Sequence, residues 1–140
     1  MEKKNLIIGQ SGGPSAAINA TLAGALSAAA QSECVGKVYG AFHGIEGVLR
    51  KNVIDLTGFR EFEKLAATPA MALGSCRRRL PDDLMDPIYP EIAGKLRELN
   101  AGWLLYTGGN DSMDTVHKLS AYFAHCKTLH PEAEYPVVYG

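Results

Sequence analysis

Two glycine-rich turns, each between an apolar strand and a helix, constrain the fold of this chain more than any other feature. The first, Ser11-Gly12-Gly13-Pro14-Ser15, follows the apolar run Leu6-Ile7-Ile8. The second, Thr107-Gly108-Gly109-Asn110-Asp111-Ser112, follows Trp103-Leu104-Leu105-Tyr106. Glycine leaves backbone N–H groups open to a ligand, and a helix start adds free N–H groups and the positive end of a dipole. Two such turns in one sheet predict an anion, with phosphate favoured, held from two sides.

The order of apolar strands and helical segments predicts an α/β fold. We expect strands at 5–8, 35–39, 53–56, 103–107 and 136–139, and helices at 15–31, 59–66, 88–100 and 111–124. Gly40, Gly44 and Gly47 are expected in a loop with a short turn of helix, and residues 68–81 are expected to be irregular. Strand–helix alternation favours an open, mostly parallel sheet with flanking helices and right-handed crossovers. The 140 residues suit a single domain, residues 1–140.

Charge and cysteine usage exclude several classes of protein. The formal net charge of −1 argues against a general nucleic-acid binder and against attachment to an acidic membrane surface. No apolar run has the length of a signal peptide or of a membrane span. Cys34, Cys76 and Cys126 form no Cys-x-x-Cys pattern, which favours reduced, packed thiols and a cytoplasmic protein.

The glycine turns match neither common nucleotide motif. The first has adjacent glycines rather than Gly-x-Gly-x-x-Gly, and no Walker A sequence is present. In the second turn, Asn110 and Asp111 offer oxygens that suit Mg²⁺ beside a phosphate, although Asp111 also suits a helix cap. A carboxylate next to a polyphosphate requires a cation, so a divalent ion belongs to this hypothesis.

Basic residues supply a further candidate. Arg77, Arg78 and Arg79 lie near Gly74 and Ser75, and arginine matches phosphate oxygens well, although a solvated basic loop has the same composition. The four histidines share no spacing typical of a metal site. His117 and Lys118 are expected on a helix surface.

Three ordered segments resemble motifs of the phosphofructokinase family. Residues 12–20, Gly-Gly-Pro-Ser-Ala-Ala-Ile-Asn-Ala, resemble its opening glycine turn and helix. Residues 73–77, Leu-Gly-Ser-Cys-Arg, resemble its Leu-Gly-Ser-x-Arg segment, and residues 108–112, Gly-Gly-Asn-Asp-Ser, resemble its Gly-Gly-Asp-x-Ser loop. The likeness covers essentially the whole chain, aligned with the N-terminal part of the family's longer, Rossmann-like fold.

The resemblance implies phosphoryl transfer to the 1-hydroxyl of fructose 6-phosphate, with Mg²⁺. It implies that Gly12 and Gly13 contact the phosphoryl donor and that Arg77, more than Arg78, clamps the transferring phosphates. The donor phosphates would be cradled by Gly109, Asn110, Asp111 and Ser112. The full-length protein is expected to be a homo-oligomer.

Departures from the family pattern bear on the donor. Asp111 stands where ATP-using members usually have Gly and pyrophosphate users typically have Asp, because a charged side chain there crowds the α-phosphate of a nucleotide. Ile45 stands where many ATP users place an aromatic residue near adenine. Asn110 replaces the family's metal-binding Asp and is a weaker, neutral ligand. Ala16 and Ala17 stand where the family commonly has Pro-Gly.

The family's catalytic base is an Asp in a loop that follows a strand like 136–139, and it is not present before Gly140. The expectation is therefore the donor-binding N-terminal part of a pyrophosphate-dependent 6-phosphofructokinase, inactive by itself. Two alternatives stay open, an ATP-dependent kinase of the same family and a non-catalytic phosphate- or nucleotide-binding module.

Overall fold

The protein is described by a computed structural model that covers residues 3–10, 16–57, 80–108 and 110–140. Its elements, in chain order, are β1 (Lys4–Gln10), α1 (Ala16–Gln31), β2 (Val35–Ala41), α2 (Ile45–Arg50), β3 (Val53–Asp55), α4 (Ile88–Glu98), β4 (Ala101–Thr107), α5 (Asn110–Leu129) and β5 (Val137–Tyr139). The helix expected at 59–66 lies outside the described residues. Within the described ranges, no helix is both long and apolar enough to cross a bilayer.

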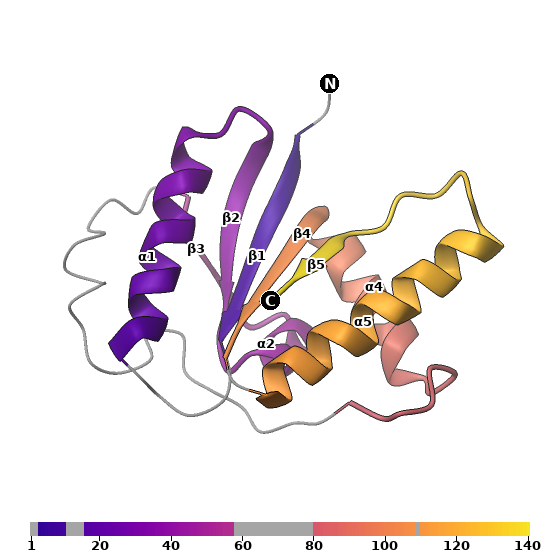
Figure 1. Ribbon diagram of the computed structural model, residues 1–140. Coiled ribbons are helices and arrows are strands. Elements are labelled where there is room, and N and C mark those ends of the chain that lie inside the picture. The colour runs from indigo at the N-terminus through magenta and orange to yellow at the C-terminus, as the bar shows by residue number, and fades with distance from the viewer. Residues whose placement is uncertain (1–2, 11–15, 58–79, 109) are drawn as a thin grey trace.

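A five-stranded sheet in the order β3-β2-β1-β4-β5 organises the molecule (Figure 1). β1 lies at its centre and pairs in parallel with both β2 and β4, and β5 pairs in parallel with β4. The prediction of an open, mostly parallel α/β sheet is confirmed. β1 is apolar on both faces because helices cover both faces of a parallel sheet.

β3 is the one described strand that runs antiparallel, with Ala41 opposite Val53 and Tyr39 opposite Asp55. Only residues 42–52 separate β2 from β3, fewer than the dozen or more that a parallel crossover needs. The six-residue helix α2 fits into this connection without carrying the chain back to the start of the sheet. Connection length therefore decides the direction of β3.

The core has two layers, one on each face of the sheet. In Figure 1, α1 covers one face, whereas α2, α4 and α5 cover the other. Successive residues of β1 point to opposite faces, so Ile7 packs in the layer of α2, α4 and α5, and Ile8 packs with Leu22 and Leu26 of α1. Each of these fully buried aliphatic side chains stabilises the fold by about 1.5–3 kcal/mol.

Several predicted boundaries differ from the structure. α5 continues to Leu129, beyond the expected end at residue 124, because no glycine or proline interrupts the helix before Pro131. Gly40 lies inside β2 rather than in a loop, since pairing with Ile8 of β1 keeps the backbone extended. Cys34 is exposed, so the expectation of a packed thiol is wrong there, and Cys126 is half-buried.

An aromatic cluster between α4 and α5 gives a pH-dependent prediction. The Tyr122 ring stacks on the Tyr89 ring with centroids 5.3 Å apart. Burial, with a further contribution from Cys126, raises the pKa of Tyr122 to about 12. Because the folded state favours the neutral phenol, its stabilising effect is complete below the ordinary tyrosine pKa of about 10. That effect is then lost as the pH rises towards 12.

We expect Tyr122 to be among the last tyrosines to ionise when tyrosinate absorbance is followed during an alkaline titration. Tyr122→Phe should remove that late phase and flatten the fall of unfolding free energy above about pH 10. Tyr139→Phe is the matched control, because Tyr139 is 52% exposed. Loss of the late phase in the Tyr139 variant instead would contradict the assignment.

Candidate functional site

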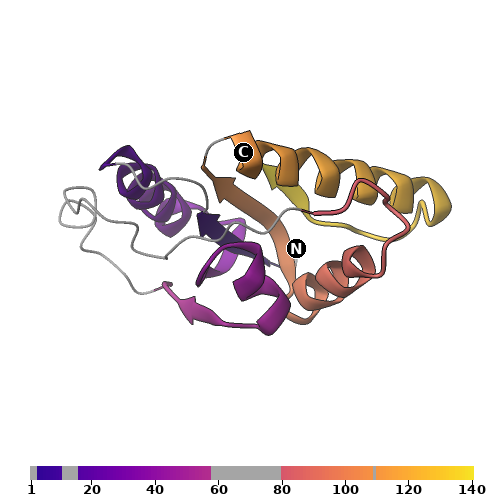
Figure 2. The ribbon, with the colours of Figure 1, turned by 90° about the horizontal axis from the view of Figure 1, so that it is seen from below.

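The two glycine turns leave the sheet from adjacent points at its carboxyl edge. The last paired residues of β1 and β4 are Gln10 and Thr107, on neighbouring parallel strands about 4.8 Å apart. Figure 2 looks onto this edge, where α1 and α5 begin. The chain passes from β1 to β2 on one side and later returns to place β4 on the other side of β1. The boundary between β1 and β4 is therefore a topological switch point, the place where open α/β sheets bind ligands.

The structure describes only some of the site residues that the sequence predicts at this edge. Gly12, Gly13, Arg77 and Gly109 lie outside the described residues. Asn110 and Asp111 form the beginning of α5, but their side chains lie outside the part of the chain that the structure describes. Ser112, in the first turn of α5, is fully buried and has an interaction partner.

Buried polar side chains lie beside the switch point. Gln10, at the end of β1, is fully buried, and Thr115, in α5, is 2% exposed. Both have interaction partners, as buried polar groups need. The ends of β1 and the first turns of α5 are thus held in place by polar as well as apolar contacts.

Lys118 is a functional candidate that sequence reasoning misplaced. It was expected on the surface of α5 with His117, but only His117 is exposed, whereas the Lys118 side chain is 10% exposed. Its Nζ lies 2.7 Å from Asp114 Oδ2 and 3.0 Å from Asp82 Oδ1, and donates to the Leu80 carbonyl oxygen at 2.8 Å. The hydrogen bonds to Asp114 and then Asp82 raise the Lys118 pKa, so the ammonium stays charged.

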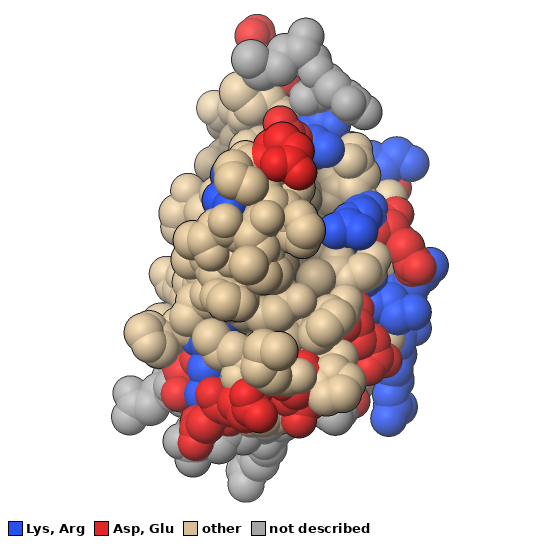
Figure 3. Space-filling view, turned by 90° about the vertical axis from the view of Figure 1, so that its right-hand side faces the viewer, with Lys and Arg blue, Asp and Glu red and all other residues tan. Residues whose placement is uncertain are grey.

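The i,i+4 spacing of Asp114 and Lys118 was the available signal for this cluster. It could not show the third partner, because the Leu80 carbonyl belongs to a segment distant in sequence. Figure 3 shows acidic side chains gathered along the lower border of the face on which α5 and residues 80–87 lie. Lys118 offsets one of the two negative charges of Asp114 and Asp82.

Tyr106 connects β4 to the loop after β2. Its hydroxyl accepts a hydrogen bond from the Ile45 N–H at 3.1 Å, and Ile45 is fully buried. The Ile45 side chain is therefore part of the core layer beneath α2, α4 and α5 rather than an exposed wall for a base. Gly9 lies against the Tyr106 ring, since a Cβ at position 9 would approach it to 3.1 Å.

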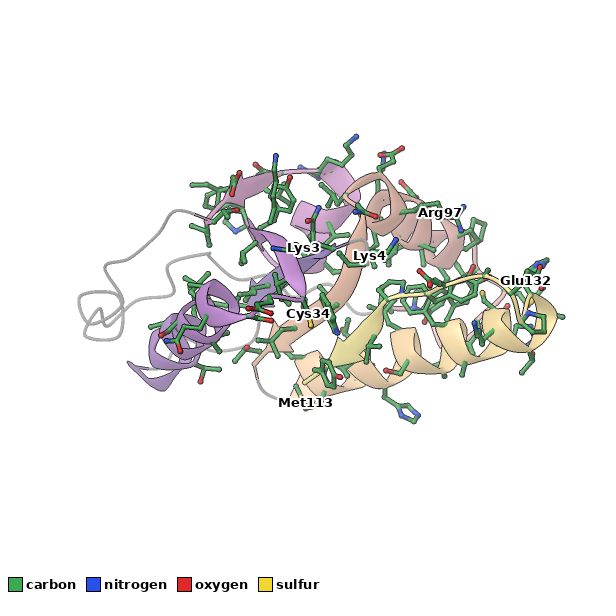
Figure 4. The ribbon with its side chains drawn as sticks, turned by 90° about the horizontal axis from the view of Figure 1, so that it is seen from above. Lys3, Lys4, Cys34, Arg97, Met113 and Glu132 are labelled. Carbon is green, nitrogen blue, oxygen red and sulfur yellow. The ribbon has the colours of Figure 1, made fainter. Side chains whose placement is uncertain are left out.

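A third strand end reaches the same edge. Gly140 follows β5 and lies against Met113, because a Cβ at position 140 would come within 2.6 Å of the Met113 sulfur. Figure 4 shows Met113 at the start of α5, beside the end of β5. β4 and β5 thus both contact α5, and the end of β5 lies beside its beginning.

A magnesium ion in this region would take only one or two ligands from the described part of the protein and the rest from substrate phosphates and water. Among the described residues, no three His, Cys, Asp or Glu side chains lie together as a metal cage. Mg²⁺ in phosphoryl-transfer sites commonly takes one or two protein ligands and completes its shell with substrate phosphates and water. By residue type alone, Asn110 and Asp111 offer one amide oxygen and one carboxylate for such an ion.

Comparison with known proteins now gives the family. Residues 5–137 match the family model described as Phosphofructokinase. The chain belongs to the phosphofructokinase family. The pyrophosphate-dependent phosphofructokinase of Nitrosospira multiformis, a solved structure, superposes with a TM-score of 0.80 at 33% identity, over 96% of this chain and 32% of that one.

Two curated relatives carry the same name, pyrophosphate–fructose 6-phosphate 1-phosphotransferase. The protein of Xanthomonas campestris is 40% identical over 135 residues, covering 90% of this chain and 32% of the relative. The protein of Rhodospirillum rubrum is 38% identical over 122 residues, covering 86% of this chain and 29% of the relative. The chain thus spans about a third of the length of these phosphofructokinase relatives.

Proposed function

We propose that this chain is the donor-binding, N-terminal α/β domain of a pyrophosphate-dependent 6-phosphofructokinase, with residues 1–140 forming that domain. The full-length protein would transfer a phosphoryl group from pyrophosphate to the 1-hydroxyl of fructose 6-phosphate. One observation carries the proposal. Both glycine turns leave adjacent strands, at Gln10 and Thr107, at the switch point of the sheet. The names of the relatives at 38–40% identity support the same reaction.

Phosphoryl transfer depends mainly on positioning the donor and on neutralising charge in the transition state. In our proposal, backbone N–H groups of Gly12, Gly13 and Gly109 hold the donor oxygens, as free amides at strand ends and helix starts do. The guanidinium of Arg77 clamps the transferring phosphates. When bound, Mg²⁺ supplies neutralisation of the donor charge, and Asn110 is the residue of this chain that would contact it.

We assign the choice between pyrophosphate and ATP as phosphoryl donor to Asp111. A carboxylate at the start of α5 takes up space and repels an α-phosphate, whereas pyrophosphate ends before that position. The fully buried Ile45 adds no exposed aromatic surface for adenine. Both features favour pyrophosphate over ATP.

The test is a donor competition assay on the complete reading frame that contains this chain, run beside the 140-residue chain alone. With Mg²⁺ and fructose 6-phosphate, we expect bisphosphate product from pyrophosphate with the complete frame and none with the 140-residue chain. Turnover with ATP equal to that with pyrophosphate would favour the ATP-dependent alternative. Calorimetric binding of pyrophosphate without product from the complete frame would favour a non-catalytic module.

Asp111→Gly tests the assignment of donor choice. We expect the ratio of ATP to pyrophosphate turnover to rise at least about tenfold, which corresponds to about 1.4 kcal/mol of transition-state free energy. Asp83→Gly is the matched control, because it makes the same substitution at an exposed carboxylate. An unchanged ratio in the Asp111 variant would remove Asp111 from donor selection.

A further inference from the structure

Lys118 joins two parts of the chain that are 38 residues apart. Its ammonium, on a residue in the third turn of α5, donates to the Leu80 carbonyl oxygen at 2.8 Å. It also pairs with Asp82 at 3.0 Å, two residues further along the same segment. One buried cation thus holds both ends of the segment Leu80–Asp82 against α5.

A second contact holds the same segment from α4. The Tyr89 hydroxyl donates a hydrogen bond to the Pro81 carbonyl oxygen, and Tyr89 is fully buried. Leu80 itself is 2% exposed and packs in the core layer of α2, α4 and α5. Two successive carbonyl groups are therefore fixed by side chains from two different helices.

We call the contacts of Lys118 and Tyr89 with Leu80–Asp82 the anchor. Its position matters because the arginine-rich segment directly precedes Leu80 in the sequence. Arg77 lies three residues before Leu80, so covalent geometry keeps its Cα within about 11 Å of the Leu80 Cα. Lys118 lies eight residues after Asn110, which is about 12 Å along a helix. By holding Leu80 on α5, these contacts limit how far Arg77 can lie from that helix.

Charge gives the anchor a second effect. Asp114 and Asp82 both pair with Lys118, and Asp114 lies only one helical turn from the start of α5. An unpaired carboxylate at Asp114 would repel an anion bound at the start of α5, since one helical turn is shorter than the Debye length of about 8–10 Å. Lys118 reduces that repulsion while it holds the segment, whereas the charge of Asp82 is largely screened because that side chain is 98% exposed.

We propose that Lys118 is a positioning residue for the donor site, which fixes Leu80–Asp82 on α5 and offsets one of the two negative charges of Asp114 and Asp82. This inference rests on the proposed function for its ligand, a pyrophosphate anion. An apolar side chain of similar length fills the same space without a hydrogen bond or a charge, so Lys118→Met separates these roles from packing.

The experiment measures two quantities on the same 140-residue samples. One is the dissociation constant for pyrophosphate, measured by calorimetry with and without Mg²⁺. The other is hydrogen exchange of the backbone amides at 82–86, where the Asp86 N–H bonds to the Asp83 carbonyl oxygen at 3.1 Å. Lys127→Met is the matched control, since Lys127 lies on the same helix and donates to the Ala133 carbonyl oxygen at 2.6 Å.

We expect Lys118→Met to raise the dissociation constant at least about tenfold and to speed exchange at 82–86 by a similar factor, through loss of charge-assisted hydrogen bonds. Lys118→Arg should keep the dissociation constant and the exchange rate within about threefold of those of the parent chain, because it keeps the charge and the hydrogen-bond donors. Tyr89→Phe, which changes no charge, should speed exchange and weaken binding by about threefold. Lys127→Met should change neither quantity.

Faster exchange with unchanged affinity in Lys118→Met would overturn the proposal, since Lys118 would then be a structural anchor alone. Equal weakening by Lys127→Met would overturn it as well. If Lys118→Met does not fold, Tyr89→Phe decides, and unchanged affinity in that variant rejects the proposal. If the parent 140-residue chain binds no pyrophosphate, the same affinity comparison is made in the complete reading frame, and a complete frame that binds no pyrophosphate would overturn the proposed function instead.

Discussion

Replacing Gly47 with Ala is expected to destabilise the domain by about 3 kcal/mol, the upper range for overpacking a core. A Cβ at position 47 would lie 2.1 Å from the Phe42 carbonyl oxygen and 2.9 Å from the Phe42 nitrogen. These are backbone atoms, so no side-chain rotation relieves the contact. The same loop is closed by hydrogen bonds from the Asn52 N–H to the Gly47 carbonyl oxygen and from the Phe42 N–H to the Asn52 carbonyl oxygen.

Gly94→Ala is the matched control, because Gly94 lies inside α4 and a Cβ there meets nothing within 4 Å. Alanine is the better helix former, so this variant should stabilise the domain by about 0.5–1 kcal/mol. Urea unfolding followed by circular dichroism measures both changes. Equal unfolding midpoints for the two variants would show that the close approach at Gly47 does not exist.

Arg77→Ala is expected to reduce phosphoryl transfer from pyrophosphate about 10²–10³-fold in the complete reading frame. Loss of one preorganised hydrogen-bond donor that faces developing negative charge has an effect of this size. The larger part of this loss should appear in kcat, because the contact strengthens as charge develops on the transferring group. Arg77→Lys should recover only part of the rate, since an ammonium is a point charge and cannot make the paired contacts of a guanidinium.

Arg78→Ala is the control for this prediction, because it removes the same charge one residue away. It should lower the rate by less than about tenfold, the effect of a general change in local charge. Steady-state kinetics of the three variants with pyrophosphate and fructose 6-phosphate measure the effects. A larger loss in the Arg78 variant would assign the clamp to Arg78 instead.

Local pattern was sufficient for most of the fold. The apolar runs of β1 and β4 predicted buried parallel strands, and Ile7, Ile8 and Leu104 are fully buried. The spacing of Ile92, Leu96 and Leu99 predicted the inner face of α4, where the first two are fully buried. These elements follow from periodicity because each buries a face that the residues alone define.

Other features depended on contacts between distant segments. Asp114 and Lys118 have the spacing of an ordinary surface pair, and the burial of Lys118 arises from Leu80 and Asp82, far away in the sequence. The antiparallel direction of β3 arises from a connection too short for a crossover. Neither result has a periodic signature, so sequence reasoning placed Lys118 on the surface and did not predict the antiparallel direction of β3.

The α/β class and the place of Asp111 at the start of a helix depend on residue types and near neighbours, so the amino-acid pattern was enough to predict them. Packing of the whole chain decided that the strands before the two glycine-rich segments are adjacent, with Gln10 beside Thr107. It also decided that a buried lysine holds Leu80–Asp82 to α5. Strand order and long-range hydrogen bonds are set by the packing of the whole chain, and no local stretch of residues encodes them.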